Sequence, residues 1–177
     1  PSLPVPSDDV VTSVAVCGEE RFFVAGADGW IYLYDWQKLS LDGKFRAHRK
    51  SANQVLHIGE NRFLTASNDA TVCLWNEGTA QKGESAGPPL RTFKGHDISV
   101  VALTVMGVAD INASESCSVF VSGSRDCSLR SWDLETGKEL SRRKVLRNVV
   151  TPSCLRCLPR SNAVVVQASE DLQFRVW

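Results

Sequence analysis

One pattern occurs four times in this 177-residue chain and limits its possible folds more than any other feature. Aligned on an aspartate, the copies read DGWIYLYD (28–35), DATVCLWN (69–76), DCSLRSWD (126–133) and DLQFRVW (171–177). In each copy, alternating apolar positions lead from the aspartate to an aromatic residue, and another short apolar run precedes the aspartate. Short strands that recur about every 40 to 45 residues predict stacked β-units, because one small sheet cannot bury both of its faces alone.

A second repeated element supports this interpretation. The segments FRAH and FKGH end at His48 and His96, and each is followed by an apolar run, VLHIG or VVALTV. His96 lies farther from its aspartate than His48 does, and the polar insertion MGVADINASESC (106–117) accounts for the difference. The corresponding positions of the first and last copies are Ser7 and Val150, so only the two middle copies have this histidine.

The combination of GH, SGSRD and SWD resembles the WD-repeat β-propellers, and the resemblance covers almost the whole chain. It implies an all-β propeller whose blades each contain four antiparallel strands, named a to d from the central channel outwards. A lead-in at 1–10 would precede four blades, which we place at 11–48, 54–95, 98–147 and 152–177. We expect the outer strands near 43–48, 89–95 and 139–147.

The resemblance also assigns a role to the repeated polar residues. In the family, the aspartate accepts hydrogen bonds from the turn amides and from the histidine, which connects through a strand-b hydroxyl to the strand-c tryptophan. The implied sets are His48, Thr65 or Ser67, Asp69 and Trp75 in blade 2, and His96, Ser122 or Ser124, Asp126 and Trp132 in blade 3. We expect this network to be structural, and to be weaker or absent in blades 1 and 4.

The fourth copy stops at Trp177, before any outer strand. One alternative is that PSLPVP supplies the missing strand, although prolines at 1, 4 and 6 cannot donate to a strand ladder. The other is that these blades belong to a seven- or eight-bladed propeller. We favour the second alternative, because an uncapped repeat array exposes apolar faces and an open sheet edge.

Composition makes several classes of partner and compartment less favoured. Lys plus Arg and Asp plus Glu each number 20, so net charge does not attract nucleic acid or anionic lipid. No apolar run is long enough to span a membrane. The six cysteines lie mostly within apolar strand patterns, which indicates a reducing, cytoplasmic compartment. Cys154 and Cys157 form a CxxC, but residues three apart on a strand face opposite sides, so we predict no metal or other cofactor.

Catalytic residues are not evident either. Two of the three histidines belong to the expected network, and His57 lies in an apolar pattern where a packed core residue is equally consistent. We find neither a catalytic constellation outside the repeats nor a glycine-rich phosphate loop, so we predict a protein without enzymatic activity.

Two surfaces are candidates for protein binding. The residues just before the turn aspartates are Ala27, Asn68, Arg125 and Glu170, and in the family this rim commonly binds partners. Arg125 is the strongest candidate, because an arginine on a concave rim can anchor a carboxylate or an aromatic group. On the opposite face, the loops at 76–89 and 106–117 would lie together, either as ordinary surface loops or as a docking patch containing Lys82, Glu84 and Asp110.

The basic runs KFRAHRK (44–50) and SRRKVLR (141–147) give an alternative, an RNA- or ribosome-associated propeller. Both runs fall on outer strands, where basic residues prevent edge-to-edge pairing, and they lack aromatic residues for base stacking. Nucleic acid is therefore the less favoured partner. Trp30 is expected to pack between blades.

We therefore predict a non-enzymatic scaffold for protein–protein interaction within a multi-protein complex. DDVVTSVAV, YDWQ, RNVVT and SEDLQFRVW resemble a cilium-associated member of the family, which implies ciliary, axonemal or transport-complex partners and a cilium or flagellum. A ubiquitin-ligase substrate receptor is a further alternative. The family motif for that role, Trp-Asp-x-Arg, is replaced here by Trp132-Asp133-Leu134-Glu135.

Overall fold

The structure, a computed structural model, describes residues 10–82, 87–106, 118–144, 152–158, 165–169 and 174–176. These residues form four separate antiparallel sheets, in which neighbouring strands are consecutive in the sequence. Blade 1 contains β1 (Val11–Cys17), β2 (Arg21–Gly26), β3 (Trp30–Asp35) and β4 (Ser40–Arg46), and blade 2 contains β5 (Ala52–His57), β6 (Arg62–Ser67), β7 (Thr71–Asn76), the short 3₁₀ helix η1 (Glu77–Lys82) and β8 (Arg91–Lys94). Blade 3 contains β9 (Val100–Met106), β10 (Val119–Ser124), β11 (Ser128–Asp133) and β12 (Glu139–Lys144), and blade 4 contains β13 (Pro152–Cys157), β14 (Val165–Ser169) and β15 (Phe174–Val176).

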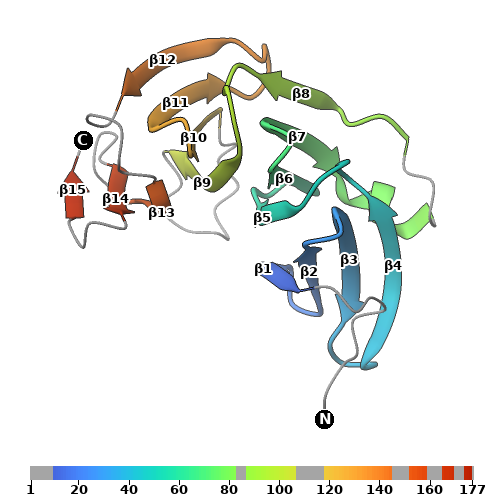
Figure 1. The fold of residues 1–177 in the computed structure, drawn as a ribbon. Coiled ribbons are helices and arrows are strands. Elements are labelled where there is room, and N and C mark those ends of the chain that lie inside the picture. Colours follow the sequence, from blue (N-terminus) through green and yellow to red (C-terminus); the bar gives the residue numbers. More distant parts are fainter. Residues whose placement is uncertain are drawn as a thin grey trace.

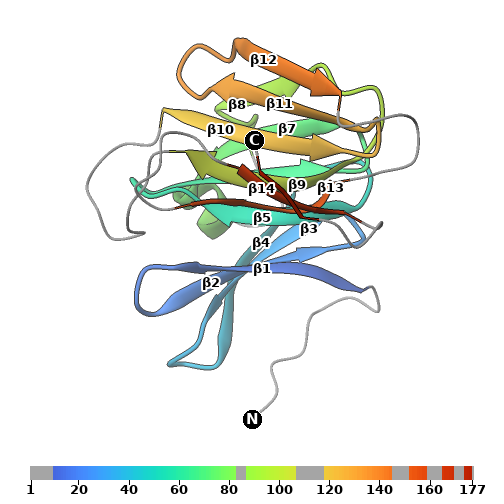
Figure 2. The same ribbon diagram turned by 90° about the vertical axis from the view of Figure 1, so that its left-hand side faces the viewer.

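The four sheets are arranged as an open arc of blades (Figure 1). The first strand of every blade lies on the inner side of the arc, and β4, β8 and β12 lie on its outer side (Figure 1). After a quarter turn, blade 1 and the outer strand of blade 3 lie at opposite ends of the view (Figure 2). The predicted fold class, an all-β propeller built from four-stranded blades, is therefore confirmed. Within the described ranges, the molecule has no helix with the length and apolar character needed to cross a membrane.

Apolar side chains alternate along the strands and fill the spaces between blades. Between blades 1 and 2, Phe23, Phe45 and Phe63 are completely buried, and the ring centroids of Phe23 and Phe63 lie 4.3 Å apart. Between blades 2 and 3, Phe93 packs edge to face against Phe120, with a centroid separation of 4.8 Å. Each blade thus buries one face against its neighbour, as the repeat pattern requires.

Polar side chains connect the inner strands of successive blades. Thr12 Oγ1 in β1 donates to Ala52 O in β5, and Val55 N donates to Ser13 Oγ at 3.3 Å. Farther along the arc, Cys157 N in β13 donates to Thr104 Oγ1 in β9 at 3.1 Å. These contacts use backbone groups that the strand ladders leave free, so the blades are fastened to each other by hydrogen bonds as well as by apolar packing.

The turn between the second and third strands has the same backbone conformation in blades 1 to 3. The residue after the aspartate has a positive φ in each: 84° at Gly29, 70° at Ala70 and 62° at Cys127. A left-handed residue at this point tightens the turn and directs the aspartate back over its own strands. In blades 1 to 3, the residue after the repeated aspartate is therefore constrained in its backbone conformation but not in its side-chain type.

Two expectations differ from the structure. The outer strand of blade 1 begins at Ser40 rather than near residue 43, and the outer strand of blade 2 covers only Arg91–Lys94.

Trp30 does not pack between the described blades. It packs with Tyr32 and Tyr34 on the face of blade 1 that points away from blade 2, because Ile31 and Leu33 occupy the opposite face. Lys44 Nζ lies 5.2 Å from the centroid of the Trp30 ring.

Candidate functional site

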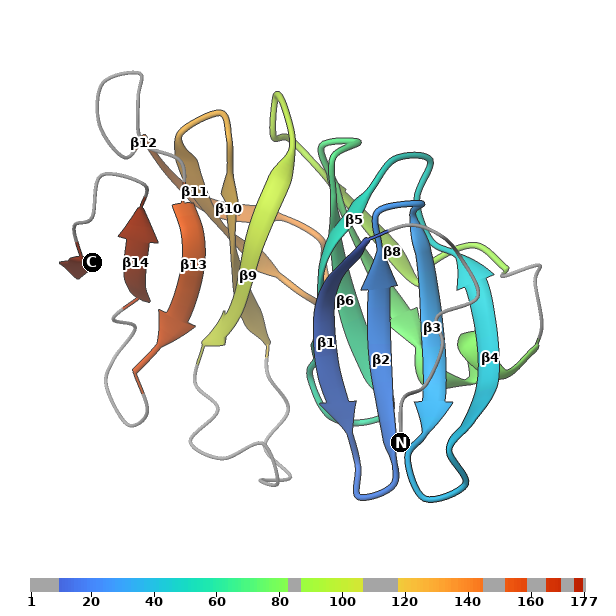
Figure 3. The ribbon, with the colours of Figure 1, turned by 60° about the horizontal axis from the view of Figure 1, so that its bottom comes forward.

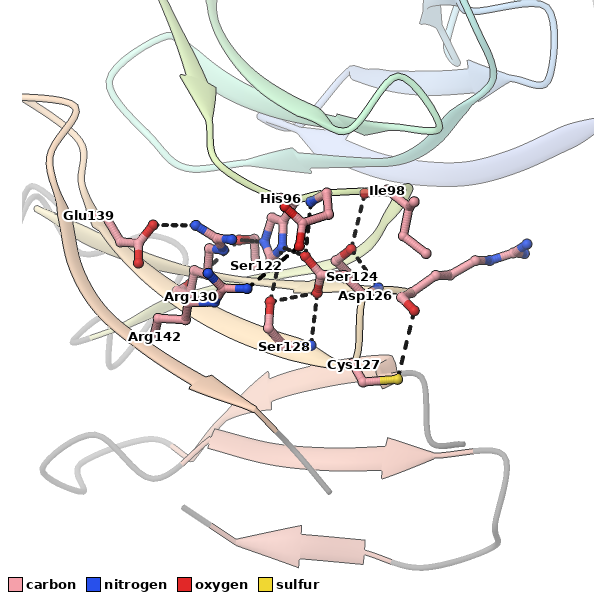
Figure 4. A network of polar contacts seen from close by, with 12 residues as sticks. His96, Ile98, Ser122, Ser124, Asp126, Cys127, Ser128, Arg130, Glu139 and Arg142 are labelled. Atoms are coloured by element: carbon pink, nitrogen blue, oxygen red, sulfur yellow. Dashed lines mark hydrogen bonds and ion pairs between the residues drawn. The ribbon is translucent and has the colours of Figure 1, made fainter. Parts of the chain in front are cut away.

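The polar network of blade 3 is a directional chain of hydrogen bonds (Figure 4). Trp132 Nε1 donates to Ser122 Oγ at 2.8 Å, and Ser122 Oγ lies 2.7 Å from His96 Nε2. His96 Nδ1 lies 2.9 Å from Asp126 Oδ2. Because an ionised carboxylate only accepts, Nδ1 carries the proton and Nε2 accepts from the serine. The chain therefore runs from the tryptophan to the carboxylate with every buried group satisfied.

Blade 2 contains the same chain with threonine in place of serine. Trp75 Nε1 donates to Thr65 Oγ1 at 2.9 Å, Thr65 Oγ1 lies 2.8 Å from His48 Nε2, and His48 Nδ1 lies 2.9 Å from Asp69 Oδ2. Ser67, the alternative hydroxyl, instead accepts from Asp69 N at 3.0 Å. Of the two hydroxyl candidates in each blade, the structure thus selects the one farther from the aspartate.

The two aspartates are strongly favoured in their ionised form. Burial alone would raise the pKa of Asp126, but hydrogen bonds from Ser128 and His96 outweigh it and lower the pKa to about 2. For Asp69, burial is likewise outweighed by bonds from His48 and Thr71, and the pKa falls to about 2. Burial lowers the pKa of His96, only partly offset by Asp126, which favours the neutral ring that the hydrogen-bond directions require.

Ser122, His96 and Asp126 have the connectivity of a catalytic triad, but their surroundings prevent that chemistry. Ser122 is completely buried, and its oxygen already accepts from the indole of Trp132. No substrate carbonyl can approach an oxygen enclosed in this way. The arrangement can stabilise the blade but cannot act as a nucleophile.

Blade 1 satisfies its aspartate differently. It has no histidine in the corresponding position, and the Tyr32 hydroxyl donates to Asp28 Oδ2 at 2.6 Å while Trp30 N donates to Asp28 Oδ1 at 3.0 Å. The network expected to be weak or absent is therefore replaced by a shorter one. Tyr32 was not predicted from the sequence, although its position four residues after the aspartate places both on one face of the turn.

The proposed rim residues occupy equivalent positions in successive blades. Ala27 N donates to Val10 O at 2.9 Å, Asn68 N to Ser51 O at 3.0 Å and Arg125 N to Ser99 O at 2.9 Å. Each bond joins the residue before the turn aspartate to the segment entering the first strand of its own blade. The turns and the connections between blades therefore share one end of the molecule, at the top of Figure 3.

The side chains at this end differ in how accessible they are to a binding partner. Asn68 is half-buried, and its Oδ1 accepts from Asn53 Nδ2 at 2.8 Å, whereas Arg125 is exposed. Three residues not predicted from the sequence, Arg49, Lys50 and Ile98, are also exposed in the connections at this end. Their position between a predicted outer strand and the next inner strand could have identified them as rim residues. Glu170, the fourth predicted rim residue, lies outside the described residues.

The opposite face is described only in part. Glu84 and Asp110 lie outside the described residues, and Lys82 is the last residue of η1. The 76–89 loop begins with η1, which packs against β3 and β4 of blade 1.

Glu77, the first residue of η1, is buried, and Glu77 Oε1 lies 2.7 Å from His57 Nε2. His57 is therefore a partner of Glu77 rather than an apolar core residue, and this bond lowers the pKa of Glu77.

The repeated histidine–aspartate network matches what the family comparison finds. The sequence model for "WD domain, G-beta repeat" matches residues 2–35, 40–76 and 87–133. The chain belongs to the WD40-repeat family. The matched segments include the turn aspartates and the strand aromatic residues of blades 1 to 3.

This WD40 chain is also similar to curated proteins at low sequence identity. Nuclear distribution protein PAC1 of Arthroderma otae is 29% identical over 133 residues, which is 73% of this chain and 28% of that protein. Denticleless protein homolog of Gallus gallus is 27% identical over 142 residues, 77% of this chain and 18% of that protein. WD repeat-containing protein 41 of Mus musculus is 25% identical over 114 residues, 64% and 23% respectively. The chain spans less than a third of each relative.

Solved structures support the fold. The WD40 β-propeller domain of Doa1 superposes with a TM-score of 0.74 at 21% identity, covering 94% of this chain and 50% of that one. The computationally designed Ika4 protein gives a TM-score of 0.72 at 22% identity, covering 97% and 92%.

Proposed function

We propose that this WD40 chain is a non-enzymatic scaffold whose rim of blade turns binds protein partners. One observation carries the proposal. In blades 1 to 3, the residue before the turn aspartate donates a backbone hydrogen bond of 2.9 to 3.0 Å to the segment that enters the first strand of the blade. Below each turn of blades 2 and 3, a buried hydrogen-bond chain fixes the aspartate. A rim held in this way presents side chains from successive blades with little loss of conformational entropy on binding.

Arg125 is the proposed anchor of this surface. Arg125 is exposed. Among the described residues only its backbone is hydrogen-bonded, to Ser99 O and Cys127 Sγ, and its guanidinium makes no hydrogen bond or ion pair. A planar guanidinium free of internal partners suits a carboxylate or an aromatic ring on a partner. Asn68 would contribute from the neighbouring blade. Glu170 on the rim, and Lys82, Glu84 and Asp110 on the opposite face, remain proposed contacts.

For the cellular setting we propose a cilium or flagellum, with axonemal or transport-machinery partners. This rests on the resemblance of the short segments DDVVTSVAV, YDWQ, RNVVT and SEDLQFRVW to WD repeat-containing protein 31, a cilium-associated member of the family. The chain is also similar to proteins named for nuclear distribution, and that name says nothing about cilia.

The proposal is tested by crosslinking mass spectrometry on the tagged full-length protein in ciliated cells, comparing wild type with Arg125→Glu. Lys138→Glu is the matched control, because Lys138 is exposed in the turn between β11 and β12, at the other end of the blade. We expect Arg125→Glu to reduce crosslinks to ciliary partners roughly tenfold or more, as loss of an arginine anchor does, and Lys138→Glu to leave them unchanged. Equal loss in both variants, or none in either, would place the partner elsewhere. Partners with no ciliary component would remove the proposed setting.

One observation favours the nucleic-acid alternative. All six residues of β12 are exposed, and three of them, Arg142, Arg143 and Lys144, are basic. Arg142 already lies 3.6 Å from Asp97, which reduces the charge available to phosphate. RNA binding by this edge would weaken steeply with salt and disappear when the three residues are neutralised. RNA retention that is insensitive to salt and to these substitutions would rule it out.

The structure also bears on the ubiquitin-ligase alternative. Glu135, which stands where the motif for that role has arginine, forms an ion pair with Arg62 of blade 2, with 2.7 Å between Glu135 Oε1 and Arg62 Nη1. The side chain at this position is therefore negative instead of positive, and it forms an ion pair between blades 2 and 3. We therefore do not extend the proposal to that role.

A further inference from the structure

The interface between blades 1 and 2 contains a polar cluster that the scaffold function does not use. Cys17 is the last residue of β1, His57 is the last residue of β5, and Glu77 is the first residue of η1. Their possible ligand atoms, one sulfur, one nitrogen and one oxygen, all lie within 4.8 Å of one another. Cys17 is 4% exposed and Glu77 7% exposed, and the His57 side chain is 14% exposed. Three different metal-ligand types thus converge in a nearly buried space.

The three residues lie on elements that contacts between the two blades fix in place. β1 and β5 are neighbouring inner strands joined by the bond from Val55 N to Ser13 Oγ. Glu77 N donates to Asn61 O at 2.8 Å, and η1 packs against β3 and β4. Each ligand therefore stands at the end of an anchored element, which is the preorganisation that a metal site needs.

The repeat supplies an internal comparison. In blade 3, the position that corresponds to Glu77 is Leu134: Leu134 N donates to Ser118 O at 2.8 Å, as Glu77 N does to Asn61 O. Leu134 is completely buried in the apolar core between blades 2 and 3, where it belongs to the same cluster as Ile58. The fold therefore accepts an apolar residue at this position. A buried carboxylate there is costly to desolvate and implies a compensating partner.

We propose that Cys17 Sγ, His57 Nε2 and the Glu77 carboxylate bind a Zn²⁺ ion between blades 1 and 2. Thiolate, imidazole and carboxylate are established zinc ligands, and a water molecule completes the tetrahedron. One thiolate and one carboxylate balance the charge of the ion. With zinc bonds of about 2.0 Å to nitrogen and oxygen, the two atoms need a separation of about 3.3 Å. They lie 2.7 Å apart in the hydrogen bond, so zinc binding requires Glu77 to rotate away from the His57 ring. The sulfur needs a separation of about 3.5 Å from each of the other two atoms, and all three atoms lie within 4.8 Å of one another, so Cys17 would also adjust its side chain.

The test uses the full chain, purified with a phosphine reductant and stripped of metal. Co²⁺ is titrated in while the thiolate-to-cobalt charge-transfer absorption is followed, and Zn²⁺ is then added to displace it. We expect one ion per chain and a rise in the thermal midpoint with Zn²⁺. Cys17→Ser should remove the absorption, and Glu77→Gln should weaken Zn²⁺ binding by at least about tenfold, since even outer-shell changes have effects of that size.

Two controls separate this site from other thiols. Cys127→Ser changes a partly exposed cysteine in the β10–β11 turn and should bind as wild type does. Cys154→Ser/Cys157→Ser removes the CxxC and should also leave the absorption intact. Absorption that persists in Cys17→Ser, or that disappears with the CxxC, overturns the proposal, as does wild-type protein that binds no stoichiometric ion. If Cys17→Ser fails to fold by circular dichroism, the same decision rests on Glu77→Gln.

Discussion

The side chain of Gln54 in blade 2 binds both backbone groups of Leu103 in blade 3. Gln54 Oε1 accepts from Leu103 N at 2.6 Å, and Gln54 Nε2 donates to Leu103 O at 3.3 Å. Leu103 itself is completely buried. A single primary amide thus replaces a strand partner on the inner edge of β9 and joins the two blades without a strand between them.

Replacing Gln54 with alanine should therefore destabilise the protein. The substitution leaves the amide and the carbonyl of Leu103 without their partner in a buried position, at a cost of about 1–3 kcal/mol. Urea unfolding followed by tryptophan fluorescence measures the change. The matched control is Gln37→Ala, because Gln37 is exposed in the β3–β4 turn and, among the described residues, only its backbone amide is hydrogen-bonded, to Asp35 Oδ1. Equal effects of the two substitutions would show that the clamp does not contribute.

The buried position of Leu134 predicts a second stability effect. Leu134→Ala should cost about 2–5 kcal/mol, because the cavity would open in the close-packed core between blades 2 and 3. Leu140→Ala changes the same residue type in the same blade, but Leu140 is 55% exposed and should lose about 0.5 kcal/mol or less. Chemical denaturation compares them. Similar losses at the two positions would contradict the assigned core.

The low pKa of Asp126 predicts how stability responds to acid. The folded pKa is about 2 and the unfolded value is about 3.9, so ionised Asp126 stabilises the fold above pH 4. This stabilisation is lost as the pH falls from about 4 to about 2, because the unfolded chain binds the proton first. The contribution at neutral pH is on the order of 1–3 kcal/mol.

Asp126→Asn should flatten that dependence. The amide keeps the shape of the side chain but carries no charge, so unfolding free energies measured between pH 2 and 5 should vary less in the variant than in wild type. Asp97→Asn is the comparison, since the Asp97 side chain is 72% exposed and contributes little to stability. A variant curve parallel to the wild-type curve throughout this range would contradict the assignment of a stabilising charge to Asp126.

Gly29 should be intolerant of a side chain. A Cβ at this position would lie 2.5 Å from His48 O and 2.6 Å from Lys50 O, both backbone atoms, and φ is +84°. Gly29→Ala should cost more than about 2 kcal/mol, because strain at a positive φ adds to a clash that no side-chain rotation relieves. Gly18→Ala has φ +67° and nothing within 4 Å, so it isolates the strain, about 1 kcal/mol. Thermal melting of the two variants measures the difference, and equal shifts in melting temperature would contradict a clash at Gly29.

The propeller architecture could be predicted from the sequence because its signals are local. The alternation of apolar residues sets strand faces, and the repeated aspartate marks each second turn, as at Asp69 and Asp126. The histidine, aspartate and tryptophan of the network were also identified in advance. The choice of hydroxyl was not, because Thr65 and Ser67 are two residues apart on one strand and therefore share a face. Only the position of the His48 ring relative to β6 distinguishes them.

The sequence by itself determined the blades, their order and the histidine, aspartate and tryptophan of each network, since these follow from the repeated pattern. The tertiary structure decided which faces meet. Trp30 lies away from blade 2, Gln54 reaches Leu103, and Glu77 meets His57 and Cys17, and each relationship depends on how neighbouring blades pack. Contacts between residues far apart in the sequence are fixed by the rotation of one twisted sheet against the next, which no periodicity within a single repeat records.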